Sequence, residues 1–132
     1  MSTIKSFTDI QQSRKLAEIL PLENADMCYP YDRHLNKMYG DIPYVMGYKR
    51  FNEDTDVPCW SLAALLEEIP STIINNVGED LKLHIEKEGL QYYLFYENEY
   101  TGDMFEIETE SHENMIDACV EMIIRLHESD LL

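Results

Sequence analysis

The spacing of apolar residues along residues 81–128 predicts a β-meander that leads directly into an amphipathic helix. Apolar and polar residues alternate over 81–86, which is typical of a strand with one buried face. Residues 91–97 are rich in aromatic side chains and apolar on both faces, and residues 104–109 alternate again. Short glycine-containing turns separate these segments. The pattern predicts three antiparallel strands with 91–97 in the centre.

Helical periodicity predicts the last element, which begins near residue 115 after polar residues that suit an N-cap. Its apolar arc includes Val120 and Ile124, which fall beside the acidic residues and make the arc wider than one packing partner requires. We expect a second element or another subunit to cover these two side chains. The acidic stripe on the opposite side of this helix comprises Glu113, Asp117, Glu121 and Glu128.

Two shorter helices are predicted closer to the N-terminus. The first covers residues 7–20, where Thr8 and Gln11 have the spacing of a capping box. The second follows Ser61, a suitable N-cap, and its apolar residues keep helical spacing until Pro70 ends the pattern. Short helices of this kind depend on packing against the rest of the chain.

A short strand over residues 71–77 completes the predicted elements. Together they indicate an α+β fold, in which an antiparallel meander of three or four strands packs against the C-terminal helix, with the two further helices around it. A length of 132 residues, 45% of them hydrophobic, suits a single domain that spans residues 1–132.

Residues 22–58 lack a sustained period and place tyrosines among proline and glycine residues. We favour an arm that packs over the fold and covers the second apolar face of the central strand. The alternative is a binding loop, because Tyr, Met and Arg are enriched in protein interfaces. The candidate interaction surface therefore comprises Val120, Ile124, Tyr93, Phe95, Tyr31, Tyr39, Tyr44 and Tyr48.

The net charge of −16 is unevenly distributed along the chain. Residues 1–50 contain seven basic and six acidic residues, whereas residues 51–132 contain three basic and twenty acidic residues. Such a surface repels nucleic acid phosphates and anionic membranes, and it attracts basic protein surfaces. The charge thus disfavours nucleic acid and membranes as partners and favours another protein.

No catalytic, metal-binding or phosphate-binding motif is present in the sequence. Cys28, Cys59 and Cys119 form no CxxC pair, which favours reduced thiols over a disulfide framework or a zinc site. Cys59 lacks the glycine pattern of a papain-like nucleophile, and His112 and His127 lie too far apart to share a metal. No apolar leader or long apolar run is found, so we expect a cytoplasmic protein. Because no binding motif is found, we also expect no cofactor.

The order of several short segments resembles small uncharacterised acidic proteins encoded in prophages and other mobile elements of gut bacteria. These segments are residues 7–20, Ala25-Asp26-Met27, Cys59-Trp60-Ser61-Leu62 with the leucines that follow, and Asp117-Ala118-Cys119-Val120-Glu121-Met122. The resemblance covers most of the chain. It implies a small intracellular accessory protein and supplies no catalytic residues.

Three functions follow as hypotheses. The first is a non-enzymatic module that binds another protein or associates with itself as a homodimer, on the basis of the broad apolar arc and the tyrosine-rich segment. The second is an acidic decoy that mimics nucleic acid and occupies a basic site on another protein. The third is a small enzyme with an unrecognised site, which predicts a deep pocket lined by polar groups.

Overall fold

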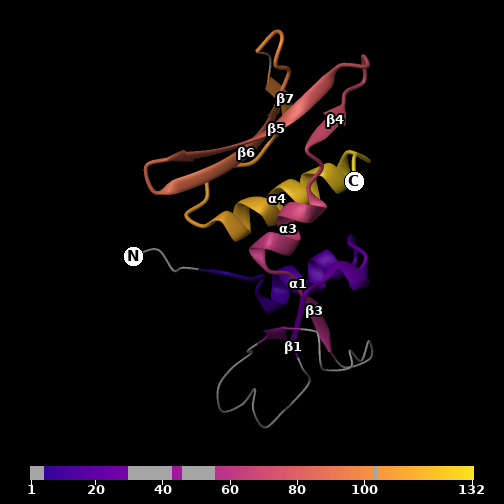
Figure 1. Cartoon of the computed structure of the whole chain (residues 1–132), viewed down its shortest axis with the longest axis vertical. Coiled ribbons are helices and arrows are strands. Elements are labelled where there is room, and N and C mark those ends of the chain that lie inside the picture. Colours follow the sequence, from indigo (N-terminus) through magenta and orange to yellow (C-terminus); the bar gives the residue numbers. More distant parts are fainter. Residues whose placement is uncertain (1–4, 30–42, 46–55, 103) are drawn as a thin grey trace.

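The computed structural model of the protein describes residues 5–29, 43–45, 56–102 and 104–132. The described helices all lie on one side of the larger β-sheet, and a smaller sheet lies at the far end of the molecule (Figure 1). The elements follow in the order α1 (Ile10–Ala17), a 3-10 turn (Leu22–Asn24), β1 (Met27–Tyr29), β2 (Tyr44–Val45), β3 (Val57–Cys59), α3 (Leu62–Glu68), β4 (Thr72–Ile74), β5 (Asp80–Glu88), β6 (Gln91–Glu97), β7 (Met104–Glu108) and α4 (Met115–Glu128).

The predicted α+β fold is confirmed. The larger sheet has the strand order β4-β5-β6-β7, and every neighbouring pair is antiparallel. Strands that follow one another in sequence are therefore neighbours in space, which is the meander that the alternation predicts. The smaller sheet has the order β2-β1-β3 and is also antiparallel.

The larger sheet has an inner face toward the helices and an outer face away from them. Leu81 of β5 and Leu94 and Tyr96 of β6 lie on the inner face and are at most 2% exposed. Because side chains alternate along a strand, His84 and Phe95 lie on the outer face. These two residues pair across β5 and β6, and Phe95 also pairs with Glu108 of β7.

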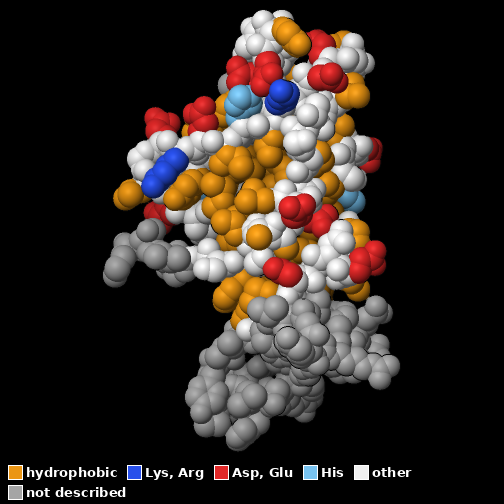
Figure 2. Space-filling model, viewed as in Figure 1, with side chains coloured by type: hydrophobic (Ala, Val, Ile, Leu, Met, Phe, Trp, Pro, Cys, Tyr) orange, Lys and Arg blue, Asp and Glu red, His pale blue; other side chains and the backbone are white. Residues whose placement is uncertain are grey.

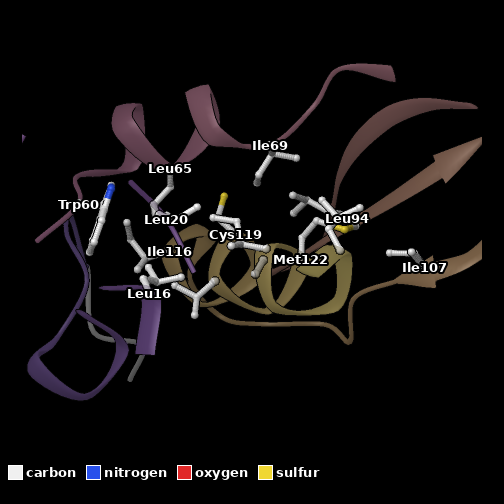
Figure 3. Packing of buried hydrophobic residues seen from close by; sticks show 14 of the residues in the cluster. Leu16, Leu20, Trp60, Leu65, Ile69, Leu94, Ile107, Ile116, Cys119 and Met122 are labelled. Atoms are coloured by element: carbon white, nitrogen blue, oxygen red, sulfur yellow. The ribbon is translucent and has the colours of Figure 1, made fainter. Parts of the chain in front are cut away.

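One hydrophobic cluster joins the inner face of the sheet to the three helices. Figure 3 shows α4 crossing the middle of this cluster, with Leu65 of α3, Leu94 of β6 and Leu16 of α1 arranged around it. Helix α4 contributes Ile116, Cys119, Met122, Ile123 and Leu126, each of which is fully buried. The helix is thus the centre of the core, and the other elements are positioned by packing against it.

The helix α4 begins where the sequence predicts, because Asn114 accepts a hydrogen bond from the backbone N–H of Asp117 at 2.8 Å. The sheet, α3 and α1 all contact it. Val120 is only 6% exposed, and Ile124 is partly buried against the core. Elements within the chain therefore cover most of the broad apolar arc, which is the first of the two alternatives that the sequence left open.

The first helix is shorter than predicted, and a different residue caps it. The capping box consists of Asp9 and Gln12, not Thr8 and Gln11. Thr8 is fully buried, and its hydroxyl group lies 2.7 Å from that of Ser13 and accepts a hydrogen bond from the Trp60 backbone N–H at 3.2 Å. Thr8 therefore joins the start of α1 to the end of β3, and the next residue takes the capping role.

The second helix agrees closely with its prediction. Ser61 is the N-cap of α3, and its hydroxyl group accepts a hydrogen bond from the Ala64 backbone N–H at 3.3 Å. Asp26 fixes this cap, because its carboxylate accepts from both the backbone N–H and the hydroxyl group of Ser61, at 2.9 and 2.5 Å. The cap therefore ties α3 to the segment that enters β1.

The described parts of the tyrosine-rich segment form the 3-10 turn and most of the smaller sheet. The backbone of Tyr44 pairs with that of Cys28, and the Tyr29 hydroxyl group donates to the backbone carbonyl of Thr8 at 2.6 Å. These strands lie at the opposite end of the molecule from β6 (Figure 1). Tyr31, Tyr39 and Tyr48 lie outside the described residues, so the arm as a cover for β6 stays a prediction.

The hairpin of β5 and β6 extends beyond the helices. On the inner face, exposure rises along β5 from 2% at Leu81 to 43% at Ile85, and Leu90 in the hairpin turn is 78% exposed. Figure 2 shows hydrophobic side chains gathered between the sheet and α3, with acidic side chains around them. Across the described parts of the chain, no helix is long and apolar enough to cross a bilayer.

Candidate functional site on the outer face of the sheet

The outer face of the larger sheet carries aromatic and acidic side chains together. Strands β5, β6 and β7 all contribute, because their antiparallel register places outward residues side by side. Figure 1 shows no described helix on this side of the sheet. We call this surface the acidic aromatic face and define it by His84, Glu86, Tyr93, Phe95, Glu97 and Glu108.

Stacked rings form the centre of the acidic aromatic face. The rings of His84 and Phe95 are nearly parallel, at 9°, and their centroids are 5.2 Å apart. Tyr93 lies two residues from Phe95 along β6, and their ring centroids are 5.8 Å apart. Phe95 is only 5% exposed, whereas His84 and Tyr93 are half-buried. The rings therefore present a shallow apolar surface whose accessible parts are His84 and Tyr93.

Carboxylates surround these rings. The Tyr93 hydroxyl group donates to Glu86 Oε2 at 2.9 Å, and this hydrogen bond raises the pKa of the phenol. Glu97 Oε2 lies 3.5 Å from His84 Nε2, beyond the usual length of a hydrogen bond, and His84 Nε2 makes none within the described structure. Glu108 is exposed beside Phe95. The face therefore keeps carboxylate oxygens that the described side chains leave available to a cationic group.

The single lysine on the outward side of β5 does not neutralise this face. Lys82 is directed toward Glu99, with Nζ 3.2 Å from Oε2. Carboxylates beside accessible rings suit guanidinium and ammonium groups, because the oxygens accept charge-assisted hydrogen bonds and the ring faces attract cations. The arrangement can therefore bind basic side chains, and arginine most readily, because its planar fork both pairs and stacks.

A second surface gathers the other predicted site residues. Val120, Ile124, Asp117 and Glu121 line a groove of about 470 Å³ between α1 and α4, together with Lys5, Asp9, Gln11, Gln12 and His112. The structure thus brings together residues of the predicted interaction surface and of the acidic stripe. Tyr93 and Phe95 belong to the sheet instead, so the predicted surface is divided between two places.

The carboxylates of this groove are occupied by partners within the chain. Asp117 accepts from Lys5 Nζ at 2.9 Å, from Gln12 Nε2 at 2.6 Å and from Asn114 Nδ2 at 2.8 Å. Burial opposes ionisation of Asp117, but these hydrogen bonds outweigh it and lower the pKa of the carboxyl group. Asp117 therefore fastens α1 and the segment before it to α4.

Glu121 is held in the same way. Its oxygens lie 2.6 Å from His112 Nε2 and 2.5 Å from Arg125 Nε, and the backbone N–H of Glu110 donates at 3.0 Å. Burial raises its pKa, whereas the hydrogen bonds lower it and prevail. Of the acidic stripe, only Glu113 and Glu128 remain exposed at the two ends of α4. The middle of the stripe is a structural network, not a free anionic surface.

Cys59 and Cys119 lie in environments that disfavour the reactive thiolate form. Cys59 is fully buried, and burial raises the pKa of its thiol. Burial also raises the pKa of Cys119 to about 12. Within the described ranges, no group of three or more His, Cys, Asp or Glu residues is arranged to hold a metal ion. Both thiols are part of the packed interior.

The comparisons with known proteins leave the function to be argued from this geometry. The chain matches no family model, no curated protein and no solved structure. The resemblance to prophage-encoded proteins therefore stays a prediction.

Sequence reasoning missed four members of the acidic aromatic face: His84, Glu86, Glu97 and Glu108. Alternation along 81–86 places His84 and Glu86 on the less buried side of their strand, and this signal was available. What the sequence does not specify is the register between strands. That register sets Glu108 and His84 on either side of Phe95 and makes one surface from three strands.

Proposed function

We propose that the protein is a non-enzymatic interaction protein, and that its acidic aromatic face binds a basic surface on another protein. The observation that carries this proposal is the stack of His84, Phe95 and Tyr93 amid carboxylates, on the side of the sheet away from the helices. The strongly acidic composition of residues 51–132 adds long-range attraction for a basic partner. Arginine is the preferred contact, because stacking and paired hydrogen bonds act together.

A basic peptide of defined sequence tests most directly whether the acidic aromatic face binds basic side chains. We would titrate the isotope-labelled protein with an arginine-rich peptide, follow backbone amide shifts by NMR, and repeat the titration with the equivalent lysine peptide. We expect shifts at residues 84–86, 93–97 and 108, tighter binding of the arginine peptide, and weaker binding as salt rises. Shifts confined to other regions would contradict the proposal.

Matched variants distinguish binding at the acidic aromatic face from attraction by the net negative charge. Glu108→Gln removes one exposed carboxylate from the acidic aromatic face, and Glu113→Gln removes one from the segment that leads into α4. We expect Glu108→Gln and Tyr93→Ala to weaken peptide binding several-fold and Glu113→Gln to leave it nearly unchanged. Equal losses for Glu108→Gln and Glu113→Gln would mean that only the net charge matters.

The acidic decoy is a narrower form of the same proposal, in which the partner's basic surface is itself a nucleic-acid site. Competition distinguishes the two forms once a partner is isolated. A decoy is displaced from the partner by a DNA or RNA duplex, whereas a partner with separate sites binds both at once. Neither result requires this chain to contact nucleic acid directly.

A further inference from the structure

Strand β4 is an uncharged edge in a strongly acidic protein. It is the terminal strand of the larger sheet, and no other described strand pairs with it on its free side. Residues 69–78, which contain β4, include no charged side chain, although the whole chain carries a net charge of −16. Exposed edge strands are normally protected by charges, prolines or bulges, because they can pair with other chains. The strand β4 is short but has no charge to protect it.

The backbone groups of two β4 residues point away from the sheet. On either side of β4, the carbonyl of Ser71 accepts from the Leu83 N–H of β5 at 2.9 Å. The N–H of Asn75 donates to the carbonyl of Glu79, just before β5, at 3.0 Å. In an antiparallel ladder the inward bonds fall on alternate residues, so Ile73 also bonds to β5. Thr72 and Ile74 therefore direct their N–H and carbonyl groups outward, where another strand can join them.

Exposed apolar side chains lie next to this edge, and the charged residues Arg125 and Glu128 line a second cavity beside Ile74. Ile74 is 60% exposed and Leu132 is 41% exposed. Between β4 and the last residues of the chain lies a groove of about 500 Å³, and Asp130 is its one charged lining residue within the described structure. Apolar side chains and free backbone groups thus lie together along one edge.

We propose that β4 pairs antiparallel with β4 of a second copy of this chain, so that the two sheets form one continuous sheet. Two copies with a charge of −16 each repel one another, so a stable contact needs a surface without charge at its centre. An edge that pairs with itself about a two-fold axis meets this need, because an uncharged strand faces an identical uncharged strand. Side chains of Ile74 and the groove beside it add apolar burial at the contact.

This contact is distinct from the acidic aromatic face, and salt separates the two. Salt screens the repulsion between the acidic copies, so we expect self-association to strengthen as salt rises. Binding of a basic partner has the opposite dependence. If the protein does not dimerise, the proposed binding of a basic partner is unaffected. If it does not bind a basic partner, the proposed dimer is likewise unaffected.

The test measures solution mass by analytical ultracentrifugation over a wide range of protein and salt concentrations. Ile74→Lys places a charge on the edge, and Thr72→Pro removes an outward N–H while keeping the inward bonds to β5. Leu90→Lys makes the same kind of change at an exposed apolar residue in the β5–β6 turn, far from β4, and serves as the control. Circular dichroism checks that each variant keeps its fold.

We expect the wild type and Leu90→Lys to form a reversible dimer, and both β4 variants to raise the dimer dissociation constant by roughly tenfold or more. A wild type that stays monomeric at all concentrations and salts would overturn the proposal. So would a dimer that survives Ile74→Lys, because it would use another surface. If Thr72→Pro loses its fold, Ile74→Lys alone decides, and a folded Ile74→Lys dimer of unchanged affinity refutes the pairing.

Discussion

Lys5 Nζ lies 2.9 Å from Asp117 Oδ1, which joins the segment before α1 to the first turn of α4. The same carboxylate oxygen accepts from Gln12 of α1 at 2.6 Å. One side chain of the last helix thus holds two parts of the N-terminal region, which are separated from it by most of the chain.

Asp117→Ala should destabilise the protein by about 1–2 kcal/mol, because it leaves several half-buried donors without an acceptor. The loss is modest because about a third of the Asp117 side chain is exposed, and solvent screens its ion pair with Lys5. Urea denaturation measures the change. Glu113→Ala, an exposed position near the start of the same helix, should alter stability by less than about 0.5 kcal/mol. Equal effects at the two positions would refute the structural role of Asp117.

Acid should weaken the fold through Asp117 and Glu121. Hydrogen bonds lower the pKa of both carboxyl groups below their ordinary values of 3.8 and 4.5. A carboxyl group with a lowered folded pKa stabilises the protein above its unfolded pKa, and the contribution is lost as pH falls through the folded pKa. Thermal denaturation from pH 7 to pH 3 should show a falling midpoint below about pH 4.5. A Glu121→Gln variant should lose part of that dependence, and an unchanged dependence would contradict this assignment.

The two apolar residues that sequence reasoning grouped together should behave differently. Val120→Asp places a charge at a position that is 6% exposed, and we expect loss of the cooperative fold. Ile124→Glu changes a partly exposed residue at the edge of the α1–α4 groove and should leave a folded protein. Near-ultraviolet circular dichroism and urea denaturation distinguish these outcomes. An unfolded Ile124→Glu would show that this residue belongs to the core.

Removal of the N-cap of α3 should lower the free energy of unfolding by about 1 kcal/mol. Ser61→Ala loses both the bond from the Ala64 backbone N–H and the bond to Asp26. Ser61→Asn, another good capping residue, supplies a matched control, although it brings a larger side chain near Asp26. Chemical denaturation should show that the wild type is more stable than Ser61→Ala. A Ser61→Ala variant as stable as wild type would mean that Asp26 and the following packing suffice to begin the helix.

Local patterns in the sequence were sufficient to predict the large elements. The helical spacing around Cys119 and Met122, the cap at Ser61 and the alternation along 81–86 each depend on neighbouring residues only. The capping box was misplaced by one residue, because Thr8 and Asp9 both suit a cap. The burial of Thr8 against Trp60, a contact distant in sequence, decides between them.

The candidate site required information that local patterns do not contain. The two apolar faces of β6 predicted an arm that covers its second face, and that arm lies largely outside the described residues. Within the described structure, His84 stacks on Phe95 from the neighbouring strand, and Tyr93 lies beside it. Likewise, the acidic stripe of α4 had the pattern of a free charged surface. Its central carboxylates instead bind Lys5, from the N-terminal segment, and His112, from the segment that leads into α4. These pairings follow only from the folded arrangement.

The rise in exposure along β5 from Leu81 to Ile85 implies a gradient of local stability along the sheet. Few core contacts hold the end of the β5–β6 hairpin, so local opening costs less free energy there than beside α4. The sheet should therefore fray from its turn inward, and the backbone amides of β6 should exchange with solvent in that order. Tyr93 lies nearer the turn than Phe95 and would be released first, which makes the acidic aromatic face adaptable at one end and rigid at the other.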